Sequence, residues 1–333
     1  MKKEILQMLR AAGDHFVSGQ LLCDALGVSR QAVWKNISQL KELGYEIESV
    51  SNKGYHLEGT PDRLFAPDIE SRFIADCCCK NVKCFDSLDS TNTRAKQLAG
   101  QGEPEGTLVV AEEQTNGRGR RGREWSAGPG VGVWMSLILR PQLLPQQSTG
   151  ITLTAALAVV KGIREVSKTE PLIKWPNDIV IGGKKVCGML TETNSEPDCI
   201  HYAVVGIGIN ANTPGFEGEL SGRATSVLLE SGEHVDRQAL VASVMNAFTG
   251  YYAKYLQTGD MSLLCEEYNR LLVNRDREVR ILHGLEGEVI QEQIQTGIAR
   301  GIACDGSLLV ETERGLEHVV SGEVSVRGIY GYA

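Results

Sequence analysis

The sequence predicts an α+β protein of several domains, and three observations support this prediction. The 333-residue chain is longer than a single hydrophobic core usually supports. Its first 60 residues are typical of short helices followed by a hairpin, and the middle alternates strands with long helices. Beyond residue 270, short strands are divided by glycine turns. We therefore expect domains at residues 1–60, 61–270 and 271–333.

The first domain is expected to hold a pair of helices and a hairpin. A short apolar helix over Gln20–Leu26 precedes a turn at Gly27 and a second helix that Ser29 can cap. The stretch YEIESVSNKGYHL alternates apolar and polar residues around Asn52–Gly54, which is typical of a hairpin wing. The whole resembles a winged helix-turn-helix, in which early residues of the second helix reach base edges in the major groove.

Charge places a condition on DNA binding by this domain. Residues 1–59 carry seven basic and seven acidic side chains, so the electrostatic attraction to DNA is weak. Tight binding would then need a dimer that reads two half-sites, and a small helical protein-docking module remains the alternative. The DNA-binding candidates are Ser29, Arg30, Gln31, Lys35 and Lys53.

The middle region is expected to begin after a linker, Gly59-Thr60-Pro61-Asp62. Its apolar runs predict strands at residues 82–88, 107–114, 132–139, 172–175, 178–183, 185–193 and 202–210, and helices at 91–100, 148–167 and 237–256. The last region contains strand-like runs from residue 277 onward, including GEVI at 287–290. Asp305-Gly306 there is a strong hairpin signal, so we expect a small β-barrel or sandwich.

Bulk properties favour a cytosolic, soluble protein. The net charge is −8, no apolar run is long enough to cross a bilayer, and the N-terminus lacks the apolar core of a signal peptide. The nine cysteines are odd in number and show no paired C-x-x-C spacing, so we expect reduced thiols rather than a metal site made by a side-chain cluster.

The loop NGRGRRGREW satisfies the letters of the dinucleotide pattern G-x-G-x-x-G. That pattern requires a helix directly after the glycines, whereas REWSAGPGVGVWMSLIL contains Pro129 and then a β-like run. A dinucleotide fold is therefore not expected. Glycines allow the backbone to close around an anion, and four arginines supply charge-assisted donors for phosphate or carboxylate. A solvated basic loop remains the alternative.

Three further stretches carry polar groups in positions suited to a ligand. In KWPNDIVIGGKKVCGML, Asn177 and Asp178 follow the end of a strand. Lys185 begins the next strand, in which Gly188 lets another group come close to the backbone. In VVGIGINAN, glycines alternate with aliphatic residues and suggest a ligand or backbone against the strand, although a plain core strand is equally consistent. DSTN at residues 89–92 is a helix cap whose hydroxyls could also serve a ligand.

These four stretches in this order resemble the biotin protein ligase family. With the winged helix in front, the chain is similar to the bifunctional kind that also represses biotin operons, and the resemblance covers nearly all 333 residues. It implies a class II synthetase-like catalytic domain and an SH3-like C-terminal domain that includes Gly322-Glu323-Val324-Ser325. The implied reaction uses ATP, Mg²⁺ and biotin to form biotinyl-5′-AMP, and then biotinylates a lysine of the biotin carboxyl carrier protein of acetyl-CoA carboxylase.

The resemblance also assigns roles to residues. Lys185 would neutralise the biotin carboxylate and the α-phosphate as they meet, and Arg120 would help to close the loop over the adenylate. Gly188 would leave room for the biotin tail. The implied biotin-binding set is Ser90, Thr91, Asn92, Gln114, Gly117, Arg118, Lys185 and Gly188. The implied nucleotide-binding set is Arg120, Arg121, Arg123, Trp125, Asn177, Asp178 and Asn210.

The two ends of the chain would be coupled through a homodimer. If the adenylate-bound enzyme either meets carrier protein or dimerises on operator DNA, biotinyl-5′-AMP is both intermediate and corepressor. A lipoate-type protein ligase, a non-catalytic biotin-sensing repressor and a DNA-binding adaptor remain alternatives. No membrane partner is expected.

Overall fold

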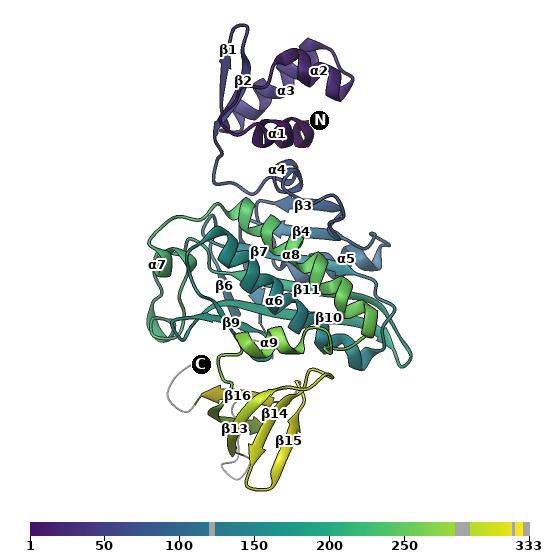
Figure 1. Cartoon of the computed structure of the whole chain (residues 1–333), viewed down its shortest axis with the longest axis vertical. Helices are drawn as coiled ribbons and strands as arrows, with labels where there is room; N and C mark the ends of the chain where they lie inside the picture. Colours follow the sequence, from purple (N-terminus) through teal and green to yellow (C-terminus); the bar gives the residue numbers. More distant parts are fainter. Residues whose placement is uncertain (120–123, 284–293, 322–323, 329–333) are drawn as a thin grey trace.

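The computed structural model describes residues 1–119, 124–283, 294–321 and 324–328. Three units follow one another along the long axis, with the N-terminal helices at one end and the C-terminal strands at the other (Figure 1). Within the described residues, no helix combines the length and apolarity needed to cross a membrane.

The N-terminal unit packs helices against a hairpin, as predicted. Its elements are α1 (Lys2–Ala11), α2 (Gly19–Leu26), α3 (Arg30–Glu42), β1 (Glu46–Val50) and β2 (Gly54–Gly59). Ser29 caps α3 by accepting a hydrogen bond from the Ala32 N–H. Helix α1 was not predicted, yet it supplies Ile5, Leu6 and Leu9 to the core of this unit. The sequence does carry the periodicity of this helix, because Ile5, Leu6 and Leu9 lie on one face.

The central unit contains a seven-stranded sheet in the order β3-β4-β7-β11-β10-β9-β8. Neighbours are antiparallel except for β3 and β4, which are parallel. The strands are β3 (Asn81–Phe85), β4 (Thr107–Ala111), β7 (Val133–Leu139), β8 (Leu172–Lys174), β9 (Asp178–Ile181), β10 (Lys184–Glu196) and β11 (Cys199–Ile209). All seven correspond to predicted strands.

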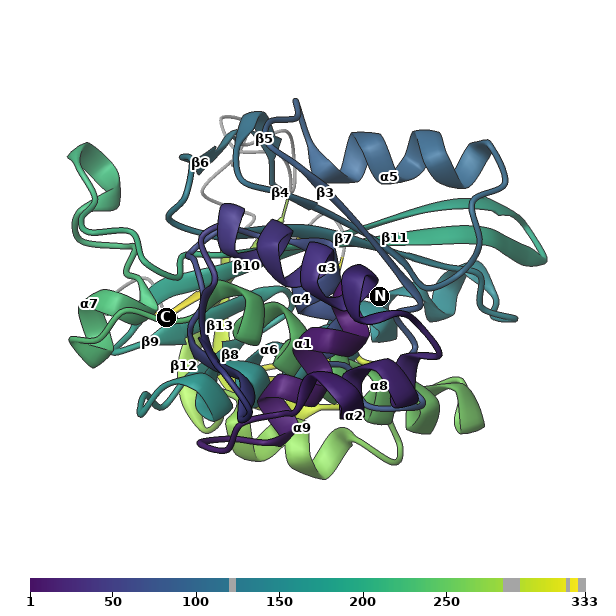
Figure 2. The same cartoon turned by 90° about the horizontal axis from the view of Figure 1, so that it is seen from above.

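Helices cover both faces of this sheet. Helix α5 (Thr91–Gly100) lies on one face, and α6 (Ser148–Val166) and α8 (Arg237–Thr258) lie on the other (Figure 2). Strand side chains alternate between the faces, so Ile138 and Val204 pack toward α5 while Leu137 and Val205 join the core under α6 and α8. The two faces of the sheet therefore differ in composition: the α6–α8 face is continuous core, and the α5 face also holds polar groups.

Shorter elements complete the central unit, and several were not predicted. They are α4 (Ala66–Ser71), β5 (Gln114–Arg118), β6 (Glu124–Ala127), α7 (Val227–Ser231), α9 (Cys265–Leu271) and the 3₁₀ turns Pro145–Gln147 and Gly218–Leu220. Strands β5 and β6 pair with each other, so a strand, and no helix, follows the glycine-arginine loop. Their pairing agrees with the prediction that excluded a dinucleotide fold.

The segment expected to be a linker is held firmly on the central unit. The Asp62 carboxylate forms an ion pair of 2.6 Å with Arg237, and the Pro61 carbonyl accepts a hydrogen bond from the Gln238 amide. Both partners lie at the start of α8 and are buried. The chain between the first two units therefore does not behave as a free tether.

The C-terminal unit is a five-stranded antiparallel sheet in the order β15-β14-β13-β12-β16. Its strands are β12 (Arg277–His283), β13 (Ile294–Ile302), β14 (Leu308–Thr312), β15 (Gly315–Val319) and β16 (Val324–Gly328). Asp305-Gly306 forms the predicted turn between β13 and β14, with Gly306 at a φ of 84°. The expected strand at 287–290 and residues 322–323 lie outside the described residues.

Candidate active site

A pocket lies on the α5 face of the central sheet, where glycines lower the surface of adjacent strands. Gly188 of β10 is paired with Gly208 of β11, and Gly206 of β11 is paired with Ser136 of β7. Because side chains alternate along a strand, these positions all share the face on which α5 lies. The pocket is lined by Ser90, Thr91, Asn92, Gln114, Arg118, Gly119, Trp125, Asn177, Lys185, Gly188, Met189, Leu190, Gly206, Ile207 and Gly208.

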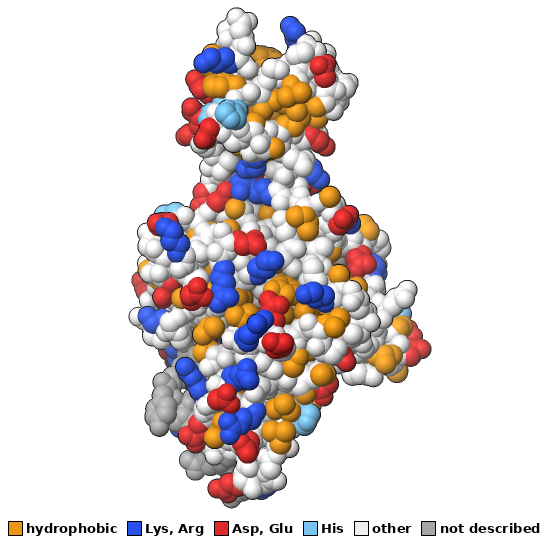
Figure 3. All heavy atoms as spheres, in the orientation of Figure 1, with side chains coloured by type: hydrophobic (Ala, Val, Ile, Leu, Met, Phe, Trp, Pro, Cys, Tyr) orange, Lys and Arg blue, Asp and Glu red, His pale blue; other side chains and the backbone are white. Residues whose placement is uncertain are grey.

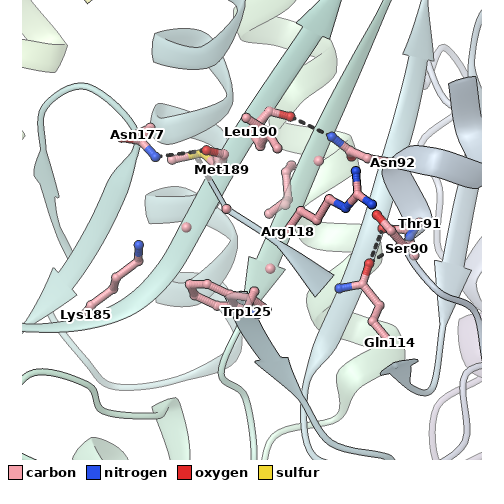
Figure 4. Close-up of a pocket in the computed structure, with 15 residues that line it drawn as sticks. Ser90, Thr91, Asn92, Gln114, Arg118, Trp125, Asn177, Lys185, Met189 and Leu190 are labelled. Atoms are coloured by element: carbon pink, nitrogen blue, oxygen red, sulfur yellow. Dashed lines mark hydrogen bonds between the residues drawn. The ribbon is translucent and has the colours of Figure 1, made fainter. Parts of the chain in front are cut away.

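One end of the pocket is a network of hydrogen-bonding groups at the start of α5. Ser90 caps this helix by accepting from the Thr93 N–H. The Gln114 side-chain oxygen accepts from both the N–H and the hydroxyl of Thr91, at 2.7 and 3.0 Å. Figure 4 shows the Arg118 guanidinium directed to the same end, near Asn92 and Thr91. This end offers donors and acceptors suited to a polar ring such as a cyclic urea.

Buried groups behind this end hold Asn92 in place. The Ser136 hydroxyl lies 2.6 Å from the Asn92 side-chain oxygen, and the Asn92 amide donates to the Leu190 carbonyl and to Glu192. Glu192 in turn forms an ion pair of 2.5 Å with Lys96 of α5. We did not predict Ser136 or Glu192 as site residues. A lone serine inside the apolar run VWMSLIL was the available signal.

The indole of Trp125 forms a wall in the middle of the pocket. It fits because Gly188 and Gly208 carry no side chain: a Cβ at Gly188 would come within 2.9 Å of Trp125 Cζ3, and one at Gly208 within 3.0 Å of Nε1. Among the described residues, Nε1 is buried and has no hydrogen-bond partner. A buried donor without a partner is costly, and an acceptor on a bound ligand would satisfy it.

Lys185 lies at the opposite end of the pocket from Thr91 and Gln114 (Figure 4). Its ammonium is 5.0 Å from the centre of the Trp125 ring and 2.6 Å from the Asp178 carboxylate. Asn177, on the turn before β9, donates to the Met189 carbonyl at 2.9 Å. A cation, a carboxylate and an indole thus surround one end of the cavity, and the hydroxyl and amide groups of Thr91, Asn92 and Gln114 line the other, together with Arg118.

The remaining predicted site residues divide into three groups. Gly117 in β5 is buried under the Trp125 backbone, which a Cβ would contact at 2.6 Å. Asn210 is buried at the end of β11 and donates to the Thr225 carbonyl, so it lies outside the set that lines the pocket. Arg120, Arg121 and Arg123 lie outside the described residues.

The predicted DNA-binding residues lie on the surface of the N-terminal unit. Arg30, Gln31 and Lys35 are exposed on α3, and Lys53 is exposed at the tip of the β1–β2 wing. Arg30 also donates to the Gln20 side chain of α2 at 2.9 Å. On the face that Figure 3 shows, basic and acidic side chains are interspersed over this unit, in keeping with its balanced charge.

Cysteines and metal-ligand clusters lie away from this pocket. All nine cysteines are free thiols, and none lines the pocket. Within the described part of the chain, three-residue groups with suitable ligand atoms occur at Glu196, Cys199 and His201 and at Glu48, His56 and Glu58. Both groups lie on hairpins of β-strands.

Comparison with known proteins identifies the family. The profile described as "Biotin/lipoate A/B protein ligase family" matches residues 84–210, "HTH domain" matches 2–56 and "Biotin protein ligase C terminal domain" matches 276–327. The "Bifunctional ligase/repressor BirA" of Bacillus subtilis is 40% identical over 98% of both chains. The chain belongs to the BirA family of bifunctional ligase/repressors.

Other members of the family agree with this assignment. The Escherichia coli protein with the same description is 28% identical over 95% of this chain and 94% of its own. Among solved structures, the biotin protein ligase of Aquifex aeolicus in complex with biotin and ATP matches with a TM-score of 0.65 and 29% identity. That match covers 75% of this chain and 99% of the Aquifex chain.

Proposed function

We propose that this chain condenses biotin with ATP to biotinyl-5′-AMP and then transfers biotin to a lysine of the biotin carboxyl carrier protein. Membership of the BirA family gives the reaction class. The single observation that best supports the proposal is the two-ended pocket, with the hydrogen-bonding groups of Thr91, Gln114 and Asn92 at one end and the Lys185 ammonium at the other. Biotin has the same polarity: a urea ring at one end and a carboxylate at the other.

The residues at the polar end are proposed to bind the urea ring. Thr91, Gln114 and Asn92 have fixed orientations because each is hydrogen-bonded to a neighbour. Such preorganisation reduces the entropy lost on binding. The exposed Arg118 side chain reaches the same end. The resemblance assigns Arg118 to the biotin carboxylate, whereas this position lies at the end proposed for the urea ring, opposite Lys185.

Lys185 is proposed to neutralise the two anions that react. The biotin carboxylate attacks the α-phosphorus of ATP, the bond to the bridging oxygen breaks, and pyrophosphate leaves. A cation fixed beside this point stabilises the charge that develops. Asp178 holds the lysine at 2.6 Å, and we assign it to contact the adenylate or its metal. Magnesium that enters with ATP supplies further charge neutralisation.

Trp125 and Asn177 are proposed to form the nucleotide side of the pocket. The indole offers a flat surface for adenine or ribose and the unpaired Nε1 donor described above. Asn210 is assigned to this side by resemblance, and its role would be indirect because its amide is engaged with Thr225. The loop with Arg120, Arg121 and Arg123 is proposed to close over the adenylate.

Biotin-dependent exchange of pyrophosphate into ATP tests the first half-reaction. The expected result is exchange with biotin and none with lipoate. Exchange with lipoate alone would establish the lipoate-type alternative, and binding of biotin without exchange would establish a biotin-sensing repressor. Transfer is tested separately by biotin incorporation into a purified carrier protein.

We further propose that the adenylate-bound chain forms a homodimer on operator DNA in the cytoplasm. The exposed residues of α3 and the wing support DNA contact, and the balanced charge of residues 1–59 favours two copies over one. Sedimentation velocity with and without biotin and ATP measures the association. Equal association in both conditions would contradict the role of the adenylate as corepressor.

A further inference from the structure

The Asn92 side chain has only one orientation that satisfies its neighbours at the polar end of the pocket (Figure 4). Its nitrogen donates to the Glu192 carboxylate at 2.8 Å and to the Leu190 carbonyl at 3.2 Å. Its oxygen accepts from the Ser136 hydroxyl at 2.6 Å. A carboxylate and a carbonyl only accept hydrogen bonds, so the nitrogen of Asn92 must face them and the oxygen must face Ser136.

This orientation decides where the single proton of the Ser136 hydroxyl goes. The Ser136 oxygen lies 2.6 Å from the Asn92 oxygen and 2.8 Å from the hydroxyl oxygen of Thr91. A hydroxyl has one proton to donate, and the nearer Asn92 oxygen takes it. Thr91 donates its own proton to the Gln114 oxygen at 3.0 Å and lines the pocket. The Thr91 oxygen therefore keeps its acceptor capacity for a donor inside the pocket.

A reversed Asn92 would change the character of Thr91. The Asn92 nitrogen would then donate to Ser136, and the Ser136 proton would turn to the Thr91 oxygen as its remaining acceptor. Ser136 has no exposed surface, so bulk solvent offers no other acceptor for this proton. The direction of the hydrogen bonds thus determines whether Thr91 is available as an acceptor toward the ligand.

The Lys96 ammonium holds Glu192 in the place that fixes this direction. It forms an ion pair of 2.5 Å with one carboxylate oxygen, and the Asn92 amide is bonded to the other. The side chains of Lys96 and Glu192 are 37% and 33% exposed, and a pair so accessible to water contributes little to stability. Neither residue is among those that line the pocket. Any effect of Glu192 on the ligand must therefore pass through Asn92.

We propose that Glu192 is a positioning residue for substrate recognition. It orients Asn92 and thereby keeps the Thr91 oxygen as an acceptor for an N–H group of the urea ring. The inference rests on the proposed function, because it takes biotin as the ligand of this pocket. It adds a requirement on the acceptor-only character of residue 192, which a residue with the same shape and a donor does not meet.

The variant Glu192→Gln keeps the shape of the side chain and replaces one acceptor oxygen by a donor. The Lys96 ammonium retains the remaining oxygen, so the new NH₂ group faces Asn92 and opposes its present orientation. We expect calorimetric titration to show biotin binding weakened by about 3- to 10-fold, as for the loss of one hydrogen bond. In pyrophosphate exchange, the KM for biotin should rise in parallel while kcat stays within about two-fold of the wild-type value.

Glu103→Gln is the matched control. Glu103 accepts from the Asn81 amide at 3.3 Å and pairs with Lys83 at 3.1 Å, so it repeats the surroundings of Glu192 outside the residues that line the pocket. This variant should leave the Kd for biotin unchanged. Equal weakening in both variants, or an unchanged Kd in Glu192→Gln, would overturn the proposal.

The double variant Lys96→Met/Glu192→Gln separates orientation from structural support. Without the ammonium, the glutamine can turn its oxygen to Asn92 and restore the original direction of the hydrogen bonds. We therefore expect the double variant to bind biotin within about two-fold of the wild-type Kd. A purely structural role for the ion pair predicts the opposite, a double variant at least as weak as Glu192→Gln. That result would overturn the proposal.

The double variant also decides the test if Glu192→Gln does not fold. A folded double variant with wild-type affinity supports the proposal, and one that is unfolded or binds weakly overturns it. If the wild-type protein exchanges pyrophosphate with biotin and every variant binds biotin equally, the proposed function stands and the role of Glu192 is wrong. A wild-type protein that does not bind biotin would contradict both.

Discussion

Among the glycines of the pocket, Gly206 is the one at which an added methyl group should disturb the structure most. A Cβ at this position would lie 2.2 Å from the side-chain oxygen of Asn92, more than 1 Å inside ordinary contact. Asn92 cannot easily retreat, because it is bonded to Ser136, to the Leu190 carbonyl and to Glu192. Gly206→Ala must therefore break part of this network or displace the strand.

The expected loss of stability has two contributions, overpacking and lost hydrogen bonds. Overpacking of a well-packed site costs about 1–3 kcal/mol, and each buried hydrogen bond that is lost adds about 0.5–1.5 kcal/mol. We expect the central domain to lose about 2–4 kcal/mol, which corresponds to a decrease in Tm of roughly 5–10 °C. Loss of one or two ligand bonds from a displaced Asn92 should weaken biotin binding by about 10- to 100-fold.

Two assays on one protein sample check this prediction. Thermal unfolding followed by circular dichroism gives the Tm, and calorimetric titration gives the Kd for biotin. Gly250→Ala is the control, because a Cβ at this position in α8 meets nothing within 4 Å and alanine favours a helix by up to about 1 kcal/mol. If Gly206→Ala retained both the wild-type Tm and the wild-type Kd, the reasoning from this contact would be refuted.

Three further predictions concern catalysis, release and pH. Lys185→Ala should abolish pyrophosphate exchange and largely retain biotin binding by calorimetry; an unchanged exchange rate would remove its assigned role. Arg120 lies outside the described residues, and Arg120→Gly should let the adenylate escape and biotinylate bystander proteins on a biotin blot. Labelling confined to the carrier protein would contradict this. Burial alone would raise the pKa of Asp68, but the charges of Arg72 and Arg10 outweigh it and lower the pKa below the ordinary 3.8. The stability that this ion pairing confers is present above the unfolded-state pKa and is lost as pH falls through the folded-state pKa. The difference in urea midpoint between wild type and Asp68→Asn should accordingly be about constant from pH 5 to 7 and shrink below about pH 4; a difference that does not change with pH would oppose this.

The sequence predicted the secondary structure best where a run was long and strongly patterned. The apolar strands of the central sheet, helices α5, α6 and α8, and the Ser29 cap of α3 are all confirmed. Helix α1 was also missed, although it is amphipathic and as long as α5, and so were the short elements α4 and β5. The local preferences of these two short elements are weak, and they are stabilised mainly by contacts with distant parts of the chain.

The candidate site shows the same division. Motifs and their order identified Thr91, Gln114 and Lys185, which the fold brings into one pocket. The local signals for Ser136 and Glu192 were weak, because a hydroxyl in an apolar run and an acidic residue in a hairpin strand are both common. Their importance comes from strand register, which places Ser136 opposite Gly206 and beneath Asn92.

What the sequence determined by itself is the order of the domains, the family and most of the polar groups that line the pocket. These features depend on local sequence patterns, which can be recognised without knowledge of the fold. Tertiary structure decided that Asp62 is anchored to Arg237 rather than part of a loose linker, that the Asn210 amide is bonded to the Thr225 carbonyl, and that Arg237 is also bonded to Glu112. Such outcomes depend on burial and on partners outside the local pattern, 15 residues away for Asn210 and more than a hundred for Arg237. A buried ion pair forms only when the fold has removed water from both charges.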